Sequence, residues 1–212
     1  MAMNIGSLER TLRKAYGPRL KCRVDQDAEM IEMHWSGFDQ YRDGSGSDSM
    51  RVVVLLQGNG EYLEVAAPSL YDASDCKHME ALCRVLLGTS LRTQLVQFSL
   101  DESDGEIRAT AEMVLMDGAC TPKQLQATIE IVKNVIDEFH PHVKLAMELG
   151  TISFPDEGTV VRPSLEDAEA ESAPPAEVDL DVTLRDSLEA SRVAGRKMWE
   201  SADPPRDVGR RV

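Results

Sequence analysis

The sequence predicts an α+β fold, in which helices pack on one face of an antiparallel sheet. Two observations predict it. From Phe98 to Leu115 a strand, an acidic turn at Asp104-Gly105 and a return strand follow one another, and a helix start comes directly afterwards at Thr121. Upstream, runs of alternating or β-branched residues between 20 and 67 predict a meander of strands. The expected order of elements is α-β-β-β-β-α-β-β-α.

The first helix is predicted over residues 7–16. Leu8, Leu12 and Tyr16 recur at every fourth position and form one apolar stripe. Ser7 is the expected N-cap, and Gly17-Pro18 ends the helix because proline cannot continue the hydrogen-bond ladder.

Four strands should follow, with turns between them. Ile31, Met33 and Trp35 alternate with polar residues, which predicts a strand with one buried face. Residues 37–50 are expected to be a flexible connection, and Gly58-Asn59-Gly60 a turn. The apolar residues of the last strand, Tyr62 included, are expected to belong mostly to the core. The four strands are predicted at 20–24, 31–35, 51–56 and 61–67.

A middle helix is predicted over roughly 73–88, capped at its C-terminal end by Gly88. Cys76 and Cys83, seven residues apart, should then share one face of it as structural side chains. Its expected apolar face consists of Met79, Leu82, Cys83, Leu86 and Leu87.

The last helix has a clear start signal. Thr121 is the expected N-cap, with proline at the next position and Gln124 three residues after the cap, which is a capping box. His140-Pro141 should interrupt the helix, so that His140-Pro141-His142 forms a surface turn rather than a metal site. The buried stripe before that break is predicted to be Leu125, Ile129, Val132, Ile136 and Phe139.

Charge limits the classes of partner. The chain of 212 residues has a formal net charge of -14, which argues against direct binding to nucleic acid or to anionic membranes. No apolar run is long enough to span a bilayer, and the first residues do not resemble a secretory signal. We therefore expect a cytoplasmic protein without membrane insertion, whose four cysteines are reduced.

Residues 51–150 resemble the YbjN-like domain family, whose fold is similar to that of type III secretion chaperones. The matching stretches are Gly60 to Pro68, Leu82 to Leu87, Phe98 to Ile107 and the helix from Leu125 to Phe139. Members of the family often have an asparagine near the end of the middle helix, whereas residues 83–88 of this chain contain none. The resemblance implies a non-enzymatic chaperone or regulator that binds another protein, often as a homodimer.

No motif predicts catalysis, a cofactor or a metal. The acidic turn around Asp101 and Asp104 lacks the spacing of an EF-hand loop, and nucleotide-binding, zinc-protease and hydrolase signatures are absent from the sequence. The sequence favours a protein-binding module whose partner it does not identify. A structural or regulatory subunit of a larger assembly, and an enzyme of unrecognised type, remain open as alternatives.

The chain is expected to divide into a folded domain at 1–152, an acidic linker at 153–181 and a C-terminal segment at 182–212. Residues 155–181 hold nine acidic residues and one arginine among several prolines, a composition typical of disorder. Residues 183–200 predict a short amphipathic helix, which would need a docking surface for stability, either on this chain or on a partner. Its proposed partner-binding residues are Leu184, Leu188, Met198 and Trp199.

Overall fold

The computed structural model describes residues 2–93, 95–116 and 118–155. They all belong to the first of two compact units, Met1–Pro175. Within them the element order is the predicted one, with a short 3-10 turn, η1 (Gly58–Gly60), added between the third and fourth strands. The prediction of an α+β fold is therefore confirmed.

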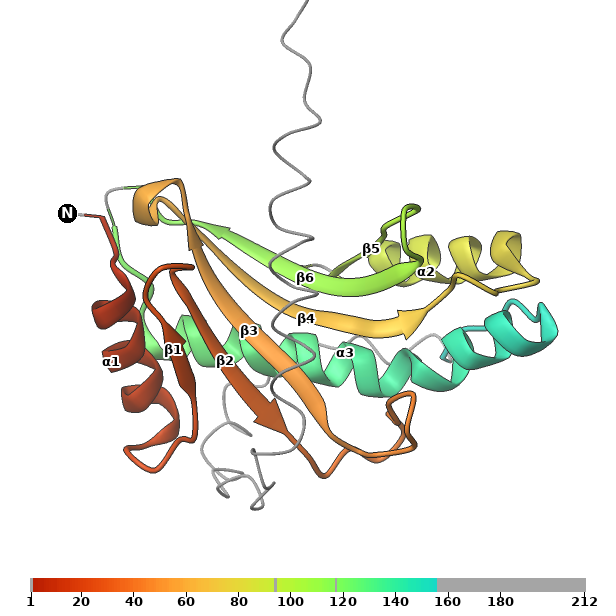
Figure 1. Ribbon diagram of the computed structural model, residues 1–212, viewed down its shortest axis with the longest axis horizontal. Coiled ribbons are helices and arrows are strands. Elements are labelled where there is room, and N and C mark those ends of the chain that lie inside the picture. The colour runs from red at the N-terminus through yellow and green to blue at the C-terminus, as the bar shows by residue number, and fades with distance from the viewer. Residues whose placement is uncertain (1, 94, 117, 156–212) are drawn as a thin grey trace, which may run out of the picture. The chain divides into compact units, whose positions relative to one another are not determined.

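The six strands form one antiparallel sheet in the order β1-β2-β3-β4-β6-β5. The meander predicted upstream makes up the first four positions, and β6 then pairs with β4 on one side and with β5 on the other (Figure 1). The first strand is shorter than predicted and begins three residues later. The strands are β1 (Arg23–Asp25), β2 (Met30–Trp35), β3 (Met50–Gln57), β4 (Tyr62–Asp72), β5 (Gln97–Leu100) and β6 (Glu106–Val114).

The strand register separates an apolar face from a polar one. Ile31 pairs with Val54, and Val54 pairs with Val65, so that all three side chains point to the same side of the sheet. All three are fully buried. Their neighbours in sequence, such as Glu32 and Glu64, point to the opposite side, which we call the open face.

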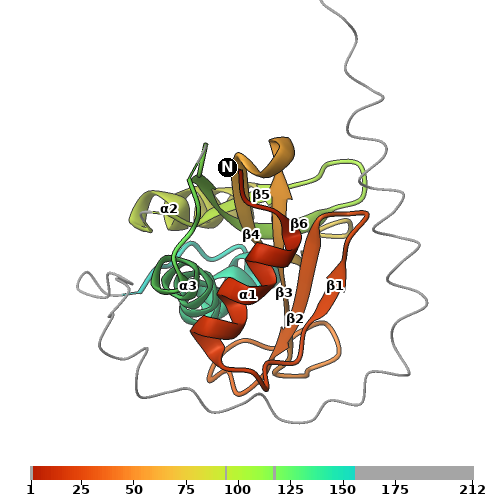
Figure 2. The ribbon, with the colours of Figure 1, turned by 90° about the vertical axis from the view of Figure 1, so that its left-hand side faces the viewer.

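The helices lie on the apolar face. The long helix α3 (Pro122–Leu149) runs along the sheet, and α1 (Ile5–Tyr16) and α2 (Met79–Arg92) each pack against it (Figures 1 and 2). Leu8 and Leu12 of α1 are fully buried, as the predicted stripe requires. The hydrophobic core lies between this helical layer and the sheet.

The start of α1 differs from its prediction. The N-cap is Asn4, whose side-chain oxygen accepts a hydrogen bond from the Ser7 backbone at 2.9 Å. The Ser7 hydroxyl in turn accepts from the Asn4 backbone at 3.0 Å. Ser7 is therefore the third helical residue of a capping box rather than the cap.

The middle helix is shifted toward the C-terminus relative to its prediction. It runs from Met79 to Arg92, so that Gly88 lies inside the helix and does not cap it. Cys76 precedes the helix and does not share a helical face with Cys83. The helix continues past Gly88 because packing of the buried Thr89 against the core outweighs the weak helix propensity of a single glycine.

The last helix is continuous. Its predicted capping box at Thr121 and Gln124 is confirmed, but the predicted break at His140-Pro141 is wrong. Pro141 lies inside the helix, which continues to Leu149. His140 is buried in the core rather than exposed in a surface turn. The apolar residues Val143 and Ala146, both fully buried, carry the packed stripe past the proline.

Candidate protein-binding surface

The helix α2 has two faces of different character. Leu82, Val85 and Leu86 are buried against the rest of the domain. On the opposite side, Leu87 and Leu91 are 72% and 85% exposed. These two residues are four apart and therefore lie one turn above the other on the same side of the helix. We call this side, made of Glu80, Arg84, Leu87, Gly88, Leu91 and Arg92, the outer face of α2.

The outer face continues beyond the end of the helix. Leu95 follows three residues after Arg92 and is 46% exposed. At the other end, Arg84 forms an exposed ion pair with Glu80 at 2.7 Å. The surface is thus an apolar ridge with charged groups at its margin, which is the general anatomy of a protein interface.

One aromatic side chain already lies on this face. A Cβ atom built on Gly88 would stand 2.4 and 2.6 Å from two ring atoms of Phe154, which follows α3 in the chain. The Arg92 guanidinium lies 3.8 Å from the centroid of the same ring. We call the space that this ring fills, bounded by Gly88 and Arg92, the Gly88 notch.

The segment that carries Phe154 is tied to the end of α3. The C-cap Gly150 has a left-handed backbone with a φ of 68°, which turns the chain back toward α2. The Ser153 hydroxyl and Nδ1 of His142 are 2.8 Å apart. These contacts hold the chain where the Phe154 ring reaches the outer face.

A shallow cavity of about 380 Å³ lies where α2 begins and α3 ends. Lys77, His78, Gly150 and Ile152 are among the residues that line it. His78 is the N-cap of α2 but makes no capping hydrogen bond, and its ring packs on Gly150. The side chains of Lys77, His78 and Glu80, which line the cavity, are exposed to solvent. The cavity therefore lacks the buried polar groups typical of an active site.

The open face of the sheet carries a charged network. Glu32 lies 3.1 Å from Nε2 of His34 and 3.2 Å from Nε of Arg51. The hydrogen bond from His34, aided by the charge of Arg51, lowers the pKa of Glu32 to about 2. The carboxylate is therefore charged and paired at neutral pH.

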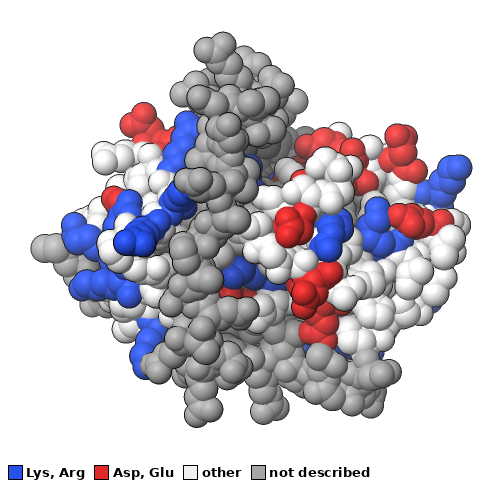
Figure 3. Space-filling view, turned by 90° about the horizontal axis from the view of Figure 1, so that it is seen from below, with Lys and Arg blue, Asp and Glu red and all other residues white. Residues whose placement is uncertain are grey.

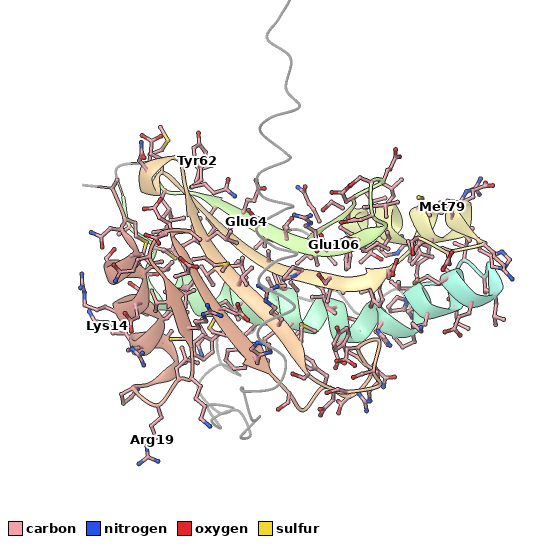
Figure 4. The ribbon with its side chains drawn as sticks, viewed as in Figure 1. Lys14, Arg19, Tyr62, Glu64, Met79 and Glu106 are labelled. Atoms are coloured by element: carbon pink, nitrogen blue, oxygen red, sulfur yellow. The ribbon has the colours of Figure 1, made fainter. Side chains whose placement is uncertain are left out.

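A second acidic group lies further along the open face (Figure 4). Glu64 is paired in register with Glu112, and burial together with this like charge raises the pKa of Glu64. Glu106 accepts hydrogen bonds from the Ser69 backbone at 2.8 Å and from Arg108 at 3.0 Å. Glu106 thereby holds the irregular part of β4, because Ser69 has a positive φ of 53° beside the register shift.

A smaller apolar cluster lies at one end of the open face. Tyr62 and Val114 are register partners across β4 and β6, and they are 46% and 67% exposed. The expectation that Tyr62 belongs to the core is therefore wrong. Met116, two residues beyond the end of β6, is also exposed. This cluster is separate from the outer face of α2.

Polar contacts join α3 to the loop after β2 and to β4. The Asp137 carboxylate accepts hydrogen bonds from the backbone of Asp39, Gln40 and Tyr41 at 2.7 to 3.2 Å. The Tyr71 hydroxyl and Nδ1 of His140 are 3.0 Å apart. Burial lowers the pKa of His140 and raises that of Tyr71, so both are neutral at physiological pH. The Asp137 hydrogen bonds fix the loop, while the Tyr71–His140 contact is buried between β4 and α3, where neither group is accessible to a substrate.

The end of the domain that carries α1 is basic, in contrast to the chain as a whole. Six basic residues and a single acidic one lie between Glu9 and Arg23. Figure 3 shows basic side chains gathered over this end, and Figure 4 shows Lys14 and Arg19 directed away from the sheet. Arg13 is engaged by Glu9 at 2.9 Å.

Among the described residues, no three His, Cys, Asp or Glu side chains are placed to hold a metal ion. The four cysteines, all within the described part, are free. Within the same residues, no helix combines the length and the apolar character needed to cross a membrane.

The four partner-binding residues predicted from the sequence, Leu184, Leu188, Met198 and Trp199, lie outside the described residues. The outer face of α2 was not predicted, and the expectation that Leu87 belongs to the same apolar face as Leu82 and Leu86 is wrong, because Leu87 is exposed. The spacing of Leu87 and Leu91 was a usable signal, but with Gly88 assigned as the helix end, Leu91 fell outside the helix.

No family model matches the chain, and no curated protein matches it either. The solved structures that are similar to it include the following two. One is the E. coli protein YbjN, proposed to be a transcription regulator, with 13% identity and a TM-score of 0.48, covering 67% of this chain and 95% of YbjN. The other is a chain of the ExsC-ExsE complex, with 16% identity and a TM-score of 0.38, covering 69% of this chain and 96% of that one.

Proposed function

We propose that this chain is a non-enzymatic protein-binding module, chaperone-like or regulatory, and that the outer face of α2 is its binding surface. The exposed pair Leu87 and Leu91 is the observation that supports the proposal. Isolated exposed leucines are ordinary, but two on successive turns, continued by Leu95, form a contiguous apolar ridge.

The ridge is suited to association because covering it removes apolar area from water. Fully burying one leucine side chain stabilises a complex by roughly 1.5–3 kcal/mol. The charged margin formed by Glu80, Arg84 and Arg92 then provides orientation rather than most of the affinity. These features fit a surface that holds a protein and does not transform it chemically.

Two further parts belong to the proposal. The first is homodimerisation in the cytoplasm, which the resemblance to YbjN-like domains implies. The second is a contribution to partner binding from Leu184, Leu188, Met198 and Trp199, which the apolar spacing of residues 183–200 supports.

The binding surface is tested by comparing three full-length chains as affinity baits. In the test variant, Leu87→Glu and Leu91→Glu introduce charge into the ridge. The matched control, Gln97→Glu with Ser99→Glu, adds the same two charges at exposed positions of the edge strand β5. The dominant protein recovered by wild type is then purified and its affinity for each chain is measured.

We expect the control to bind like wild type and the ridge variant to bind at least tenfold more weakly. Equal affinity of all three chains for the partner would exclude the outer face of α2. Homodimerisation is tested separately by light scattering, where a mass of twice 23.4 kDa is expected and a mass of 23.4 kDa would contradict it.

A further inference from the structure

We propose that the Gly88 notch recognises an aromatic side chain of the protein partner, and that Phe154 fills the notch in the free chain until the partner replaces it. This inference rests on the proposed function, because it specifies what the outer face of α2 binds. The occupant is an extended segment of the partner that presents one aromatic ring between aliphatic neighbours.

The notch requires glycine at its floor. A Cβ at position 88 would lie 2.4 Å from Phe154, a distance that carbon atoms do not reach. Glycine in a helix interior is less favourable than alanine by about 1 kcal/mol. Its presence in α2 therefore needs a compensating role, and the approach of a ring to the helix backbone supplies one.

The wall of the notch selects for aromatic side chains. Arg92 lies over the Phe154 ring at 3.8 Å from its centroid, which is a cation–π arrangement. Nη1 of Arg92 also donates to the Gly88 carbonyl at 3.1 Å, so the guanidinium is held in place above the notch. An aliphatic side chain of similar size would lose the attraction between this cation and the face of a ring.

Phe154 covers only part of the surface. With its ring in place, the neighbouring residues Leu87 and Leu91 of the outer face remain 72% and 85% exposed. Thr151 and Ile152, in the segment that leads to Phe154, are exposed as well. A partner that filled the notch and also covered both leucines would bury more apolar area than Phe154 does, and this difference favours the exchange.

The test uses the full-length Phe154→Ala chain, in which the notch is empty. The probe is a synthetic peptide with the sequence of residues 150–158, and a second peptide has alanine in place of its phenylalanine. Binding is followed by NMR through the amide signals of Gly88 and Leu91 and the side-chain Nε–H of Arg92. The blocked control is Phe154→Ala with Gly88→Ala, in which the new methyl group occupies the notch while favouring the helix.

We expect saturable shifts of these signals when the first peptide is added to the Phe154→Ala chain. We expect no shifts when the alanine peptide is added to that chain, or when the first peptide is added to the wild-type chain or to the blocked control. Adding Arg92→Met should weaken the binding by about two- to fivefold, as loss of an exposed cation–π contact implies. The Phe154→Ala chain should also bind the purified partner more tightly than wild type does.

Failure of the first peptide to bind Phe154→Ala would overturn the inference. If the peptide binds only after Trp199→Ala is added to the Phe154→Ala chain, Trp199 competes for the notch. The notch would then bind an aromatic residue of this chain rather than one of the partner, and the inference would be overturned. Either result leaves the proposed function standing if Leu87→Glu with Leu91→Glu still abolishes partner binding, so the two proposals fail separately.

Discussion

At the scale of single residues, Gly88 couples a helix to the segment that crosses it. Alanine at this position improves helix propensity by about 1 kcal/mol but collides with the Phe154 ring. We therefore expect Gly88→Ala to be neutral or destabilising in the wild-type chain, and to stabilise the Phe154→Ala chain by about 0.5–1 kcal/mol. Urea unfolding of the four chains of this double-mutant cycle measures the difference. Equal effects of Gly88→Ala in both backgrounds would show that the ring and the helix are not coupled.

Glu32 gives a pH dependence of known sign. Its pKa falls from an ordinary value of 4.5 to about 2 because His34 and Arg51 stabilise the carboxylate. The resulting stabilisation is fully present above about pH 4.5 and is lost as the pH falls through the folded pKa near 2. We expect Glu32→Gln to be less stable than wild type at pH 6, and this deficit to shrink between pH 4.5 and 2. Urea unfolding of both chains across that pH range measures the difference in stability. A difference that does not change with pH would contradict the prediction.

The residues also show what could be predicted from sequence. The role of Thr121 as N-cap followed from local pattern alone, because a capping box is made by residues three apart. The environment of His140 could not be predicted from local pattern. Its hydrogen-bond partner Tyr71 is 69 positions away, and the burial of His140 depends on how α3 packs against the sheet. The Gly88 notch likewise depends on Phe154, a contact that periodicity within α2 does not contain.

At the scale of elements, α3 retains a proline in its interior. Pro141 has no N–H, so it leaves the carbonyl of Asp137 without its usual helical donor. We expect Pro141→Ala to stabilise the domain by about 1–2 kcal/mol, since the penalty of roughly 3 kcal/mol for proline in a helix is partly offset by its restriction of the unfolded chain. Thermal and urea unfolding measure the gain, with Lys144→Ala as the control, an exposed substitution expected to change stability by less than about 0.5 kcal/mol. A loss of stability in Pro141→Ala would mean that the proline ring itself is needed for packing.

The two wrong helix boundaries have a common physical cause. Gly88 and Pro141 are both unfavourable in helices, and local propensity alone would end a helix at each. In both cases buried residues follow the break, Thr89 after the glycine and Val143 after the proline. Burial of the following turn against the core outweighs the local penalty, and only the three-dimensional packing reveals it.

At the scale of the whole domain, the two sides of the sheet have different roles. The apolar side is covered by helices, while several charges of the open face are paired within it, as Glu32 is with Arg51 and Glu106 with Arg108. A face whose charges are already paired gains little from a partner. Of the large apolar side chains in the described residues, the two most exposed, Leu87 and Leu91, lie on α2, and this favours a binding surface on the helical side.

The same packing determines how much chain the domain needs. The predicted boundary at 152 would remove Ser153 and Phe154, which contact His142 and the Gly88 notch. A chain ending at residue 160 should therefore be as stable as the full chain within about 0.5 kcal/mol, because within the described residues the core extends from Met3 to Ala146 and the last packed side chain is Phe154. A chain ending at residue 152 should be less stable by about 1–2 kcal/mol, through loss of the buried ring area and its contact with Arg92.

Urea unfolding measures the stability of the full chain and of the chains ending at 160 and 152. The substitution Phe154→Ala in the 160-residue chain should reproduce most of the loss seen in the chain ending at 152. Equal stability of the chains ending at 152 and 160 would mean that Phe154 lies on α2 without holding the domain together, and would leave its proposed role in the notch to be judged by binding alone.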